Sequence, residues 1–124
     1  ALENLKIIEE EKLVEQVKTK TGPYLKKRWQ EFNDHPLVAE VRNSGLLGAL
    51  ELSADKKTRK PFPEPGKTGF LCREICFRNG LVMRSVKDTM IVSPPLTITP
   101  RQIDEMFDLA WKCLDETARM AGII

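Results

Sequence analysis

Arg84 is the residue best placed to bind a ligand, because it follows the apolar run 81–83 and precedes a turn. We expect its guanidinium to leave the end of an apolar strand. A planar guanidinium binds a carboxylate through two parallel hydrogen bonds, and partial burial makes such a pair stronger than a surface ion pair. An edge-strand arginine paired with Asp88 or Glu51 is the structural alternative, and the local sequence leaves both interpretations open.

The segment Gly66, Lys67, Thr68 imitates the end of a phosphate-binding loop. That loop needs another glycine upstream, at the position where this sequence has Pro61. We therefore reject a phosphate site and expect Thr68 to cap the helix that follows it.

Cys72 and Cys76 are spaced i, i+4, so both thiols could lie on one helical face and ligate a metal. Two thiols are not a complete site, and His35, the only histidine, precedes Pro36 in what we expect to be a loop. We expect ordinary buried thiols and a surface imidazole. A single histidine with no marked nucleophile also argues against a Ser-His-Asp or Cys-His hydrolase.

The lysines give no candidate for chemistry at an amine. A lysine that forms a Schiff base must lose water or gain a cationic neighbour, so that its amine is neutral near neutral pH. The lysines of this chain stand in charged, helix-surface or loop contexts, and Lys67 and Lys87 stand in turns. Together with the cysteines and the single histidine, the lysines lead us to expect no catalytic, cofactor-binding or metal-ligating residue in this chain.

The composition is that of a globular domain: of 124 residues, 41% are hydrophobic and 31% are charged. These values exclude a disordered tail, a collagen-like repeat and a membrane protein. Positive and negative residues alternate to a net charge of +2, so no basic field for nucleic acid or anionic lipid is evident. Three cysteines without a signal peptide indicate a reduced, cytoplasmic protein, and a start at Ala1 inside a helical pattern indicates a fragment.

The chain alternates helical and strand-like patterns. Helical spacing over residues 2–17 predicts two helices or one bent helix. The pattern resumes over 24–32, after a bend that we expect at Gly22 and Pro23. The later patterns predict, in order, one or two strands over 37–52, an exposed connection over 53–65, a helix over 68–79 ended by Gly80, and a hairpin with strands 81–84 and 90–92. This order predicts an α+β fold in which helices cover a small antiparallel sheet.

The last helix has the clearest start signals. Thr99 is the expected N-cap, Pro100 takes the first helical position, Gln102 completes a capping box, and Ile98 can pack against Ile103. Helical spacing gathers the apolar residues that follow on one face, which we expect to be core: Ile103, Met106, Phe107, Ala110, Trp111 and Leu114.

Several short motifs follow one another across the chain. They are ALENL at 1–5, GPYL at 22–25, VRNSGLLG at 41–48, GKTGFLCR at 66–73, FRNGLVMR at 77–84, IVSPPL at 91–96 and IDEM at 103–106. Their order and spacing resemble the C-terminal part of class III aminotransferases, closest to the omega-aminotransferases that use pyruvate as acceptor. The resemblance spans essentially the whole chain.

This resemblance implies that residues 1–124 are the small C-terminal domain of a fold-type I enzyme that binds pyridoxal 5′-phosphate (PLP) and forms a homodimer. Residues 1–34 would be its linking helices, and 37–124 its sheet and covering helices. In the family a lysine and an aspartate of the large domain hold the cofactor, so we expect that domain to be the partner of this chain. The isolated chain should bind no PLP and be inactive, and neither nucleic acid nor a membrane is an expected partner.

The resemblance also implies a role for Arg84. This residue matches the family's mobile arginine, which binds the carboxylate of an amino-acid or keto-acid substrate and swings aside when the amino donor lacks one. A movable cation suits a pocket that accepts an anionic acceptor and then an uncharged or cationic donor. A fixed cation would be left buried and unpaired in one half-reaction.

Two further expectations concern the surface. Residues that face a missing domain should form an exposed apolar patch, and the candidates are Leu2, Leu5, Pro94, Pro95 and Leu96. The competing interpretation is an independent α+β regulatory or RNA-binding module. Such a module needs exposed aromatic residues or a basic stripe on its strands, and the expected strands carry neither.

Overall fold

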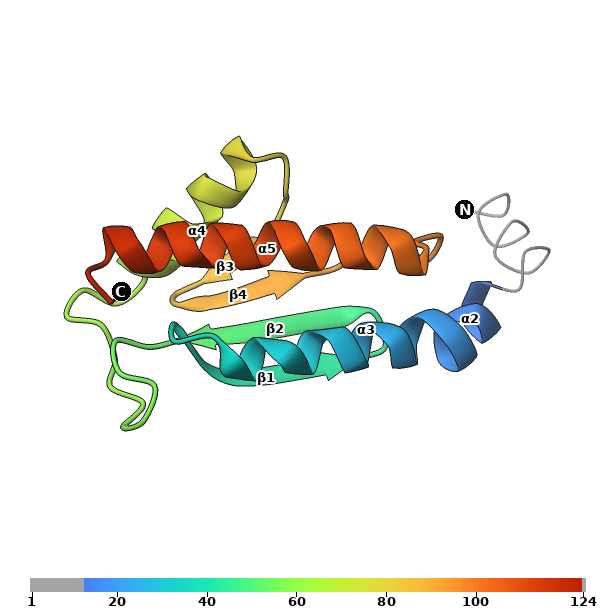
Figure 1. Cartoon of the computed structure of the whole chain (residues 1–124), viewed down its shortest axis with the longest axis horizontal. Helices are drawn as coiled ribbons and strands as arrows, with labels where there is room; N and C mark the ends of the chain where they lie inside the picture. Colours follow the sequence, from blue (N-terminus) through green and yellow to red (C-terminus); the bar gives the residue numbers. More distant parts are fainter. Residues whose placement is uncertain (1–12, 124) are drawn as a thin grey trace.

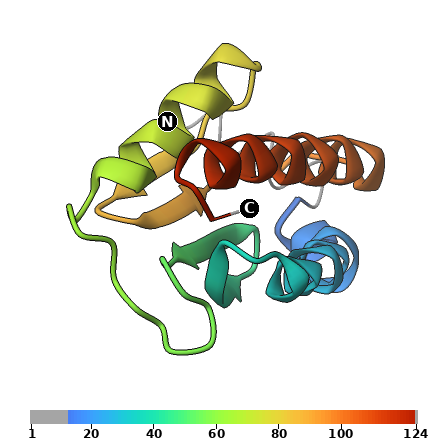
Figure 2. The same cartoon turned by 60° about the vertical axis from the view of Figure 1, so that its left-hand side comes forward.

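The computed structural model describes residues 13–123 as two layers, a four-stranded antiparallel sheet and a layer of helices (Figure 1). A second view shows α5 lying between α4 and α3 (Figure 2). The elements are α2 (Leu13–Gln16), the π-helix η1 (Val17–Thr21), α3 (Gly22–Gln30), the 3-10 helix η2 (Glu31–Asp34), β1 (Val38–Ser44), β2 (Leu47–Leu52), α4 (Lys67–Arg78), β3 (Arg84–Val86), β4 (Thr89–Val92) and α5 (Pro100–Met120). The expected α+β fold is confirmed.

The first helices are interrupted one turn earlier than expected. Residues 17–21 form a π-helical turn, in which the N–H of Gly22 donates to the carbonyl of Val17. Pro23, which has no N–H to donate, then lies in the first turn of α3. The expected helix over residues 2–8 lies outside the described residues.

The strands lie in the order β1-β2-β4-β3, with every neighbouring pair antiparallel. Residues 37–52 give two strands, because Ser44 pairs with Leu47 across a two-residue turn. Gly45 occupies the left-handed region of that turn, with φ 56°. α4 is inserted between β2 and β3, so the two hairpins meet along β2 and β4 in the middle of the sheet.

The expected strand over 81–84 is wrong in its position, because β3 begins at Arg84 instead of ending there. The residues before it end α4 in a Schellman motif. The N–H of Leu81 donates to the carbonyl of Cys76 at 2.8 Å, and that of Gly80 donates to Phe77 at 3.1 Å. Gly80 has φ 85°, which confirms it as the residue that ends the helix.

The start of α4 differs from the expected Thr68 cap. Its N-cap is Gly66, with φ 87° and no capping side chain of its own, and Thr68 is buried in the first turn. Asp88, in the turn between β3 and β4, supplies the acceptors from outside the helix. The N–H of Gly66 donates to its Oδ2 at 3.0 Å, and the N–H of Gly69 donates to its Oδ1 at 2.9 Å.

The start of α5 is as expected. The Gln102 N–H donates to Thr99 Oγ1 at 3.2 Å, and the Thr99 N–H donates to Gln102 Oε1 at 3.0 Å, which completes the capping box. Ile98 and Ile103 are both buried. The expected apolar face lies in or against the core, and it extends further along the helix through Cys113, Thr117 and Ala118.

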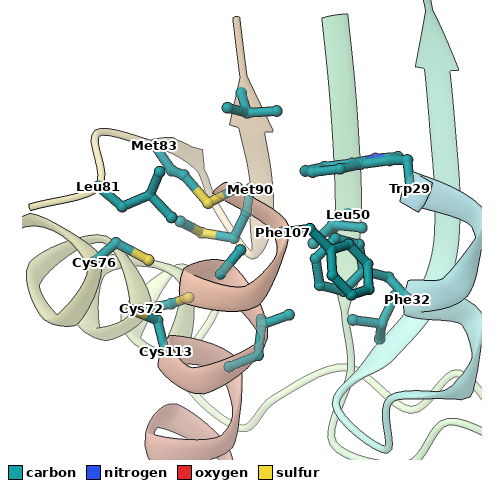
Figure 3. Packing of buried hydrophobic residues seen from close by; sticks show 14 of the residues in the cluster. Trp29, Phe32, Leu50, Cys72, Cys76, Leu81, Met83, Met90, Phe107 and Cys113 are labelled. Carbon is teal, nitrogen blue, oxygen red and sulfur yellow. The ribbon is translucent and has the colours of Figure 1, made fainter. Parts of the chain in front are cut away.

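One hydrophobic cluster joins the sheet to the helices (Figure 3). Trp29 of α3 is fully buried and lies on Gly48 of β2, where a Cβ would come within 2.6 Å of the indole. The indole N–H points to the carbonyl of Ala49 at 3.3 Å. Glycine at position 48 therefore lets the tryptophan contact the sheet directly.

The connection over 53–65 is less exposed than expected. Phe62 is 7% exposed and belongs to the core cluster, and Ser53 is 3% exposed. Asp55 and Lys60 form an isolated β-bridge that closes a small loop. The prolines and charges of this segment mark its exposed tip correctly, but its single aromatic residue anchors it to the core.

Candidate functional site

Strand register places Arg84 in a row that crosses the whole sheet. Arg42 pairs with Ala49, Ala49 with Ile91, and Ile91 with Arg84. Directly opposed residues of antiparallel strands project from the same face. The adjacent pair, Leu50 and Met90, is fully buried under the helices, and side chains alternate along a strand. The row that ends in Arg84 therefore projects from the face opposite the helices, which we call the open face.

Arg84 has neither of the partners that the structural alternative requires. The carboxylate oxygens of Asp88 accept the N–H groups of Gly66 and Gly69. Glu51 lies 3.6 Å from Arg42 instead. Within residues 13–123 no carboxylate lies within ion-pair distance of Arg84, whose side chain is exposed. Its guanidinium is therefore free to bind an anion from outside the described chain.

Arg42, at the other end of the row, differs from Arg84 because it is paired. Its guanidinium lies 3.3 Å from Glu40 and 3.6 Å from Glu51. Sequence reasoning missed this second arginine of the open face, and the only signal that could have found it is the strand register. The row thus carries one compensated and one uncompensated positive charge.

The three thiols are buried where α4 meets α5 (Figure 3). The hydrogen bond with Cys72, together with burial, raises the pKa of the Cys76 thiol, and burial raises the pKa of the Cys113 thiol. These two groups are protonated and unreactive at neutral pH. All three thiols are buried, as expected. Among residues 13–123 no group of three or more His, Cys, Asp or Glu side chains lies close enough together to hold a metal ion.

The expectation that His35 lies on the surface is wrong. Its side chain is fully buried, with Nε2 2.8 Å from Asp115 Oδ1 and Nδ1 accepting the N–H of Leu37 at 3.1 Å. The ring also packs edge-on against Trp111, with centroids 4.8 Å apart. Burial lowers the pKa of His35, and the bond to Asp115 opposes this shift. His35 is therefore a neutral structural residue that joins η2 to α5.

No lysine within the described residues has the surroundings that a Schiff base needs. All are exposed except Lys56, which is half-buried and donates from Nζ to the backbone carbonyls of Asn33 and His35. A buried, desolvated amine is what lowers a lysine pKa toward neutrality. The described residues therefore do not fit a covalent aldehyde cofactor such as PLP.

The residues expected in an exposed apolar patch differ in exposure. Pro95 and Leu96 are exposed and Pro94 is half-buried, while Leu2 and Leu5 lie outside the described residues. Sequence reasoning missed larger exposed apolar side chains near Arg84 and on the outer side of α4, namely Phe70, Phe77, Val82 and Val86. The four strands contain no aromatic residue, so the open face lacks the stacking surface that an RNA-binding sheet uses.

Of the helices in residues 13–123, none combines the length and the apolar character needed to cross a membrane.

Comparison with known sequences gives a family match over most of the chain. The family model described as aminotransferase class-III matches residues 1–114. A putrescine–pyruvate aminotransferase of Pseudomonas aeruginosa is 63% identical over 118 residues, which are 95% of this chain and 26% of that protein. A mitochondrial gamma aminobutyrate transaminase of Solanum lycopersicum is 34% identical over 96% of this chain and 23% of its own length.

Comparison with solved structures agrees with this match. The omega transaminase of Pseudomonas jessenii in complex with PMP has a TM-score of 0.90 and 35% identity, over 98% of this chain and 27% of that chain. The four-stranded sheet and its helices are therefore those of fold-type I transaminases. The chain spans about a quarter of the length of the relatives it matches.

Proposed function

The chain belongs to the class III aminotransferases, and we propose that it is the C-terminal small domain of an enzyme that transfers an amino group from an amine or omega-amino acid to a keto acid. Putrescine and pyruvate are the first donor and acceptor to test, because the relative named for them is 63% identical to this chain. In this proposal the chain contributes the side chain that binds the substrate carboxylate. The PLP-binding large domain of the same polypeptide contributes the cofactor site.

The observation that carries this proposal is the state of Arg84. Its guanidinium is exposed on the open face and is not neutralised by Asp88 or Glu51, both of which have other partners. An arginine that served the fold would be expected to pair, as Arg42 does on the same row. A free arginine on a surface without covering helices suits a ligand that arrives from a second domain.

Arg84 would bind the carboxylate of the keto acid and thereby orient its carbonyl. A bidentate pair fixes both the distance and the rotation of the substrate, which a lysine would do less well. Once a second domain covers the open face, water is excluded and the attraction between the charges grows. When the bound molecule is a diamine, the same side chain would turn toward solvent, and its exposed starting position makes such a movement possible.

Pyridoxal phosphate, when bound to the whole enzyme, supplies the electron sink for proton removal next to the amine. None of the described residues is suited to hold it, so we propose that its lysine and its partner for the pyridine nitrogen lie outside this chain. The isolated chain would then neither bind PLP nor transaminate. An absorbance band of bound PLP on the 124-residue chain would contradict this part of the proposal.

The remaining parts of the proposal concern the whole protein. We propose that it is a cytoplasmic homodimer, as the family resemblance implies. Its mass in solution, measured by light scattering on the full-length protein, tests the oligomeric state.

The experiment that tests the role of Arg84 is steady-state kinetics of the full-length enzyme. Arg84→Ala should raise the KM for pyruvate by about 10- to 150-fold, since a charged hydrogen-bonded pair contributes about 1.5–3 kcal/mol. The KM for putrescine, which has no carboxylate, should stay within about twofold. Arg42→Ala is the matched control on the same row. An unchanged KM for pyruvate in Arg84→Ala would refute the assigned role.

A further inference from the structure

β3, which carries Arg84 as its first residue, has few constraints of its own. It is three residues long, lies at the edge of the sheet and pairs only with β4. A short edge strand with one neighbour frays easily unless its ends are held. The position of Arg84 therefore depends on what fixes the two ends of the segment that runs from Gly80 to Asp88.

The first end of this segment is fixed at the C-terminus of α4. The Schellman bonds of Gly80 and Leu81 to the last turn of the helix hold the chain as it leaves α4. Leu81 and Met83 are also buried in the core cluster, on either side of exposed Val82. The backbone that leads into Arg84 is thus held by hydrogen bonds and by packing.

The second end is fixed at the N-terminus of the same helix by Asp88. Each oxygen of its carboxylate accepts one backbone N–H, from Gly66 at 3.0 Å and from Gly69 at 2.9 Å. Gly69 permits this approach, because a Cβ there would overlap the carbonyl oxygen of Lys87. Lys87 itself takes the left-handed conformation, with φ 54°, to close the two-residue turn.

The segment that carries Arg84 is therefore held at both ends of α4. At the second end the backbone carbonyl of Asp88 accepts the N–H of Leu52 at 2.9 Å, and the contact with α4 itself is made by the Asp88 side chain. We propose that Asp88 is a positioning residue for Arg84, which holds the β3–β4 turn against α4 so that the guanidinium starts from one place on the open face. This inference rests on the proposed role of Arg84 in binding the keto-acid carboxylate. In this inference Asp88 acts through the backbone, because its carboxylate accepts two N–H groups of α4 and has the same charge as the carboxylate of the keto acid.

Because Asp88 acts through Arg84, a substitution of Asp88 should change the KM only for the substrate that Arg84 binds. The strength of a bidentate ion pair depends on the angle as well as the distance between its two groups. A small displacement of β3 therefore weakens the pair that Arg84 makes. A donor without a carboxylate makes no such pair. Loosening the turn should therefore change the KM for one substrate and leave the other unchanged, which a general loss of stability would not do.

The test uses the full-length enzyme with Asp88→Asn. The amide has one oxygen where the carboxylate has two, so one of the two N–H groups loses its acceptor while the size of the side chain is kept. We expect the KM for pyruvate to rise about three- to tenfold, with the KM for putrescine and the kcat within about twofold. Asp55→Asn is the matched control, since Asp55 also accepts a backbone N–H in an exposed turn, from Lys57 at 3.0 Å, and it should change neither KM.

A second arm combines Asp88→Asn with Arg84→Ala. If Asp88 acts through Arg84, the double variant has the same KM for pyruvate as Arg84→Ala alone. An additive rise would mean that Asp88 acts independently, and an equal rise in both substrates' KM in Asp88→Asn would mean that its role is only structural. Either result overturns the inference.

The proposed function and this inference fail in different ways. An unchanged KM for pyruvate in Arg84→Ala overturns the proposed function and the inference together. A raised KM in Arg84→Ala with an unchanged KM in Asp88→Asn overturns the inference alone. Should Asp88→Asn not fold, Asp88→Ser carries the same comparison, and failure of both variants to fold would show that Asp88 is needed for folding instead, which also overturns the inference.

Discussion

α5 lies between α3 and α4, and the two contacts consist of different kinds of side chain (Figure 3). On the α3 side, Phe107 of α5 lies 4.5 Å from Phe32 between ring centroids, and the guanidinium of Arg28 lies 4.1 Å above the ring of Phe107. Arg28 also lies 2.8 Å from Glu31 and 3.1 Å from Asp104. On the α4 side the buried residues are aliphatic, such as Ile75 and Leu81, and five contain sulfur: Cys72, Cys76, Met83, Met90 and Cys113.

The two contacts of α5 therefore have different roles, because the α3 side stabilises the fold and the α4 side positions the β3–β4 hairpin. Large aromatic rings with ionic partners bury much area in one geometry, so the α3 side fixes the helices against each other. Cysteine is a small side chain and methionine an adaptable one, so both tolerate small shifts. The α4 side therefore fixes the hairpin less by packing than by backbone hydrogen bonds at the two ends of the helix.

The largest expected effect lies on the α3 side. Phe32→Ala should lower the free energy of unfolding of the 124-residue chain by about 3–5 kcal/mol, because the ring is fully buried and contacts Trp29, Phe107 and Trp111. Urea unfolding followed by circular dichroism measures this. The control Phe77→Ala removes a ring that is 68% exposed and should change stability by less than about 0.5 kcal/mol. Similar losses in both variants would contradict the comparison.

On the α4 side the expected effect comes from the backbone. Gly69→Ala should cost about 2–3 kcal/mol, because the new methyl group overlaps the carbonyl of Lys87 and no side-chain rotation can relieve it. Gly80→Ala has open space around the new methyl group and only an unfavourable φ of 85°, so it should cost about 1 kcal/mol. Urea unfolding of the two variants gives both values. Equal costs would mean that the hairpin does not press against α4.

The free energy of unfolding should also depend on pH, through the buried His35 on the α3 side. Its folded pKa lies below the ordinary 6.5 because of burial, so between the two pKa values the unfolded chain binds the extra proton. Stability is therefore complete above about pH 6.5 and falls as the pH drops below it, by at most about 1.4 kcal/mol per unit. Unfolding in urea from about pH 7.5 to about pH 5.5 measures the slope. His35→Gln, which cannot titrate, should remove this part of it, and an unchanged slope would contradict the prediction.

The smallest expected effect is at Arg84. Arg84→Gln should change the stability of the 124-residue chain by less than about 0.5 kcal/mol, because its side chain is exposed and has no ion pair within the described residues. The matched control is Arg28→Gln, which loses a cation–π contact and three carboxylate partners and should cost about 1–3 kcal/mol. Thermal unfolding of the two variants measures both changes in stability. A large loss for Arg84→Gln would make it a structural arginine.

Short sequence patterns are sufficient to predict an interaction when the residues that make it are close together in the sequence. The capping box of α5 joins Thr99 to Gln102, and the end of α4 joins Gly80 to the preceding turn. Both were predicted, because the residue types that make these bonds stand next to one another in the sequence. The family resemblance was also found from the order of short motifs.

Predictions failed where the partner lies far along the chain. The buried His35 has its partner in Asp115, and the N-terminus of α4 has its acceptors in Asp88 instead of Thr68. The hairpin strand over 81–84 is an exception with a local cause, because the backbone N–H of Leu81 ends α4 by donating to Cys76 and β3 begins only at Arg84. The candidate site shows the same limit, since Arg84 was identified from its neighbours and the family, but its place on the open face follows only from the register with Ile91.

The insertion of α4 between the two hairpins has a consequence for assembly. Leu50 pairs with Met90 across 40 residues of chain, so the sheet is completed only when two locally formed halves meet, one with α3 and β1–β2 and the other with α4, β3–β4 and α5. The exposed tip at 57–59 joins these halves and contains Lys57 and Arg59, both cleavage points for trypsin. Nicking there would leave two pieces held together by the central strand ladder and the shared core, a split protein whose re-association reports on the fold without any enzyme activity.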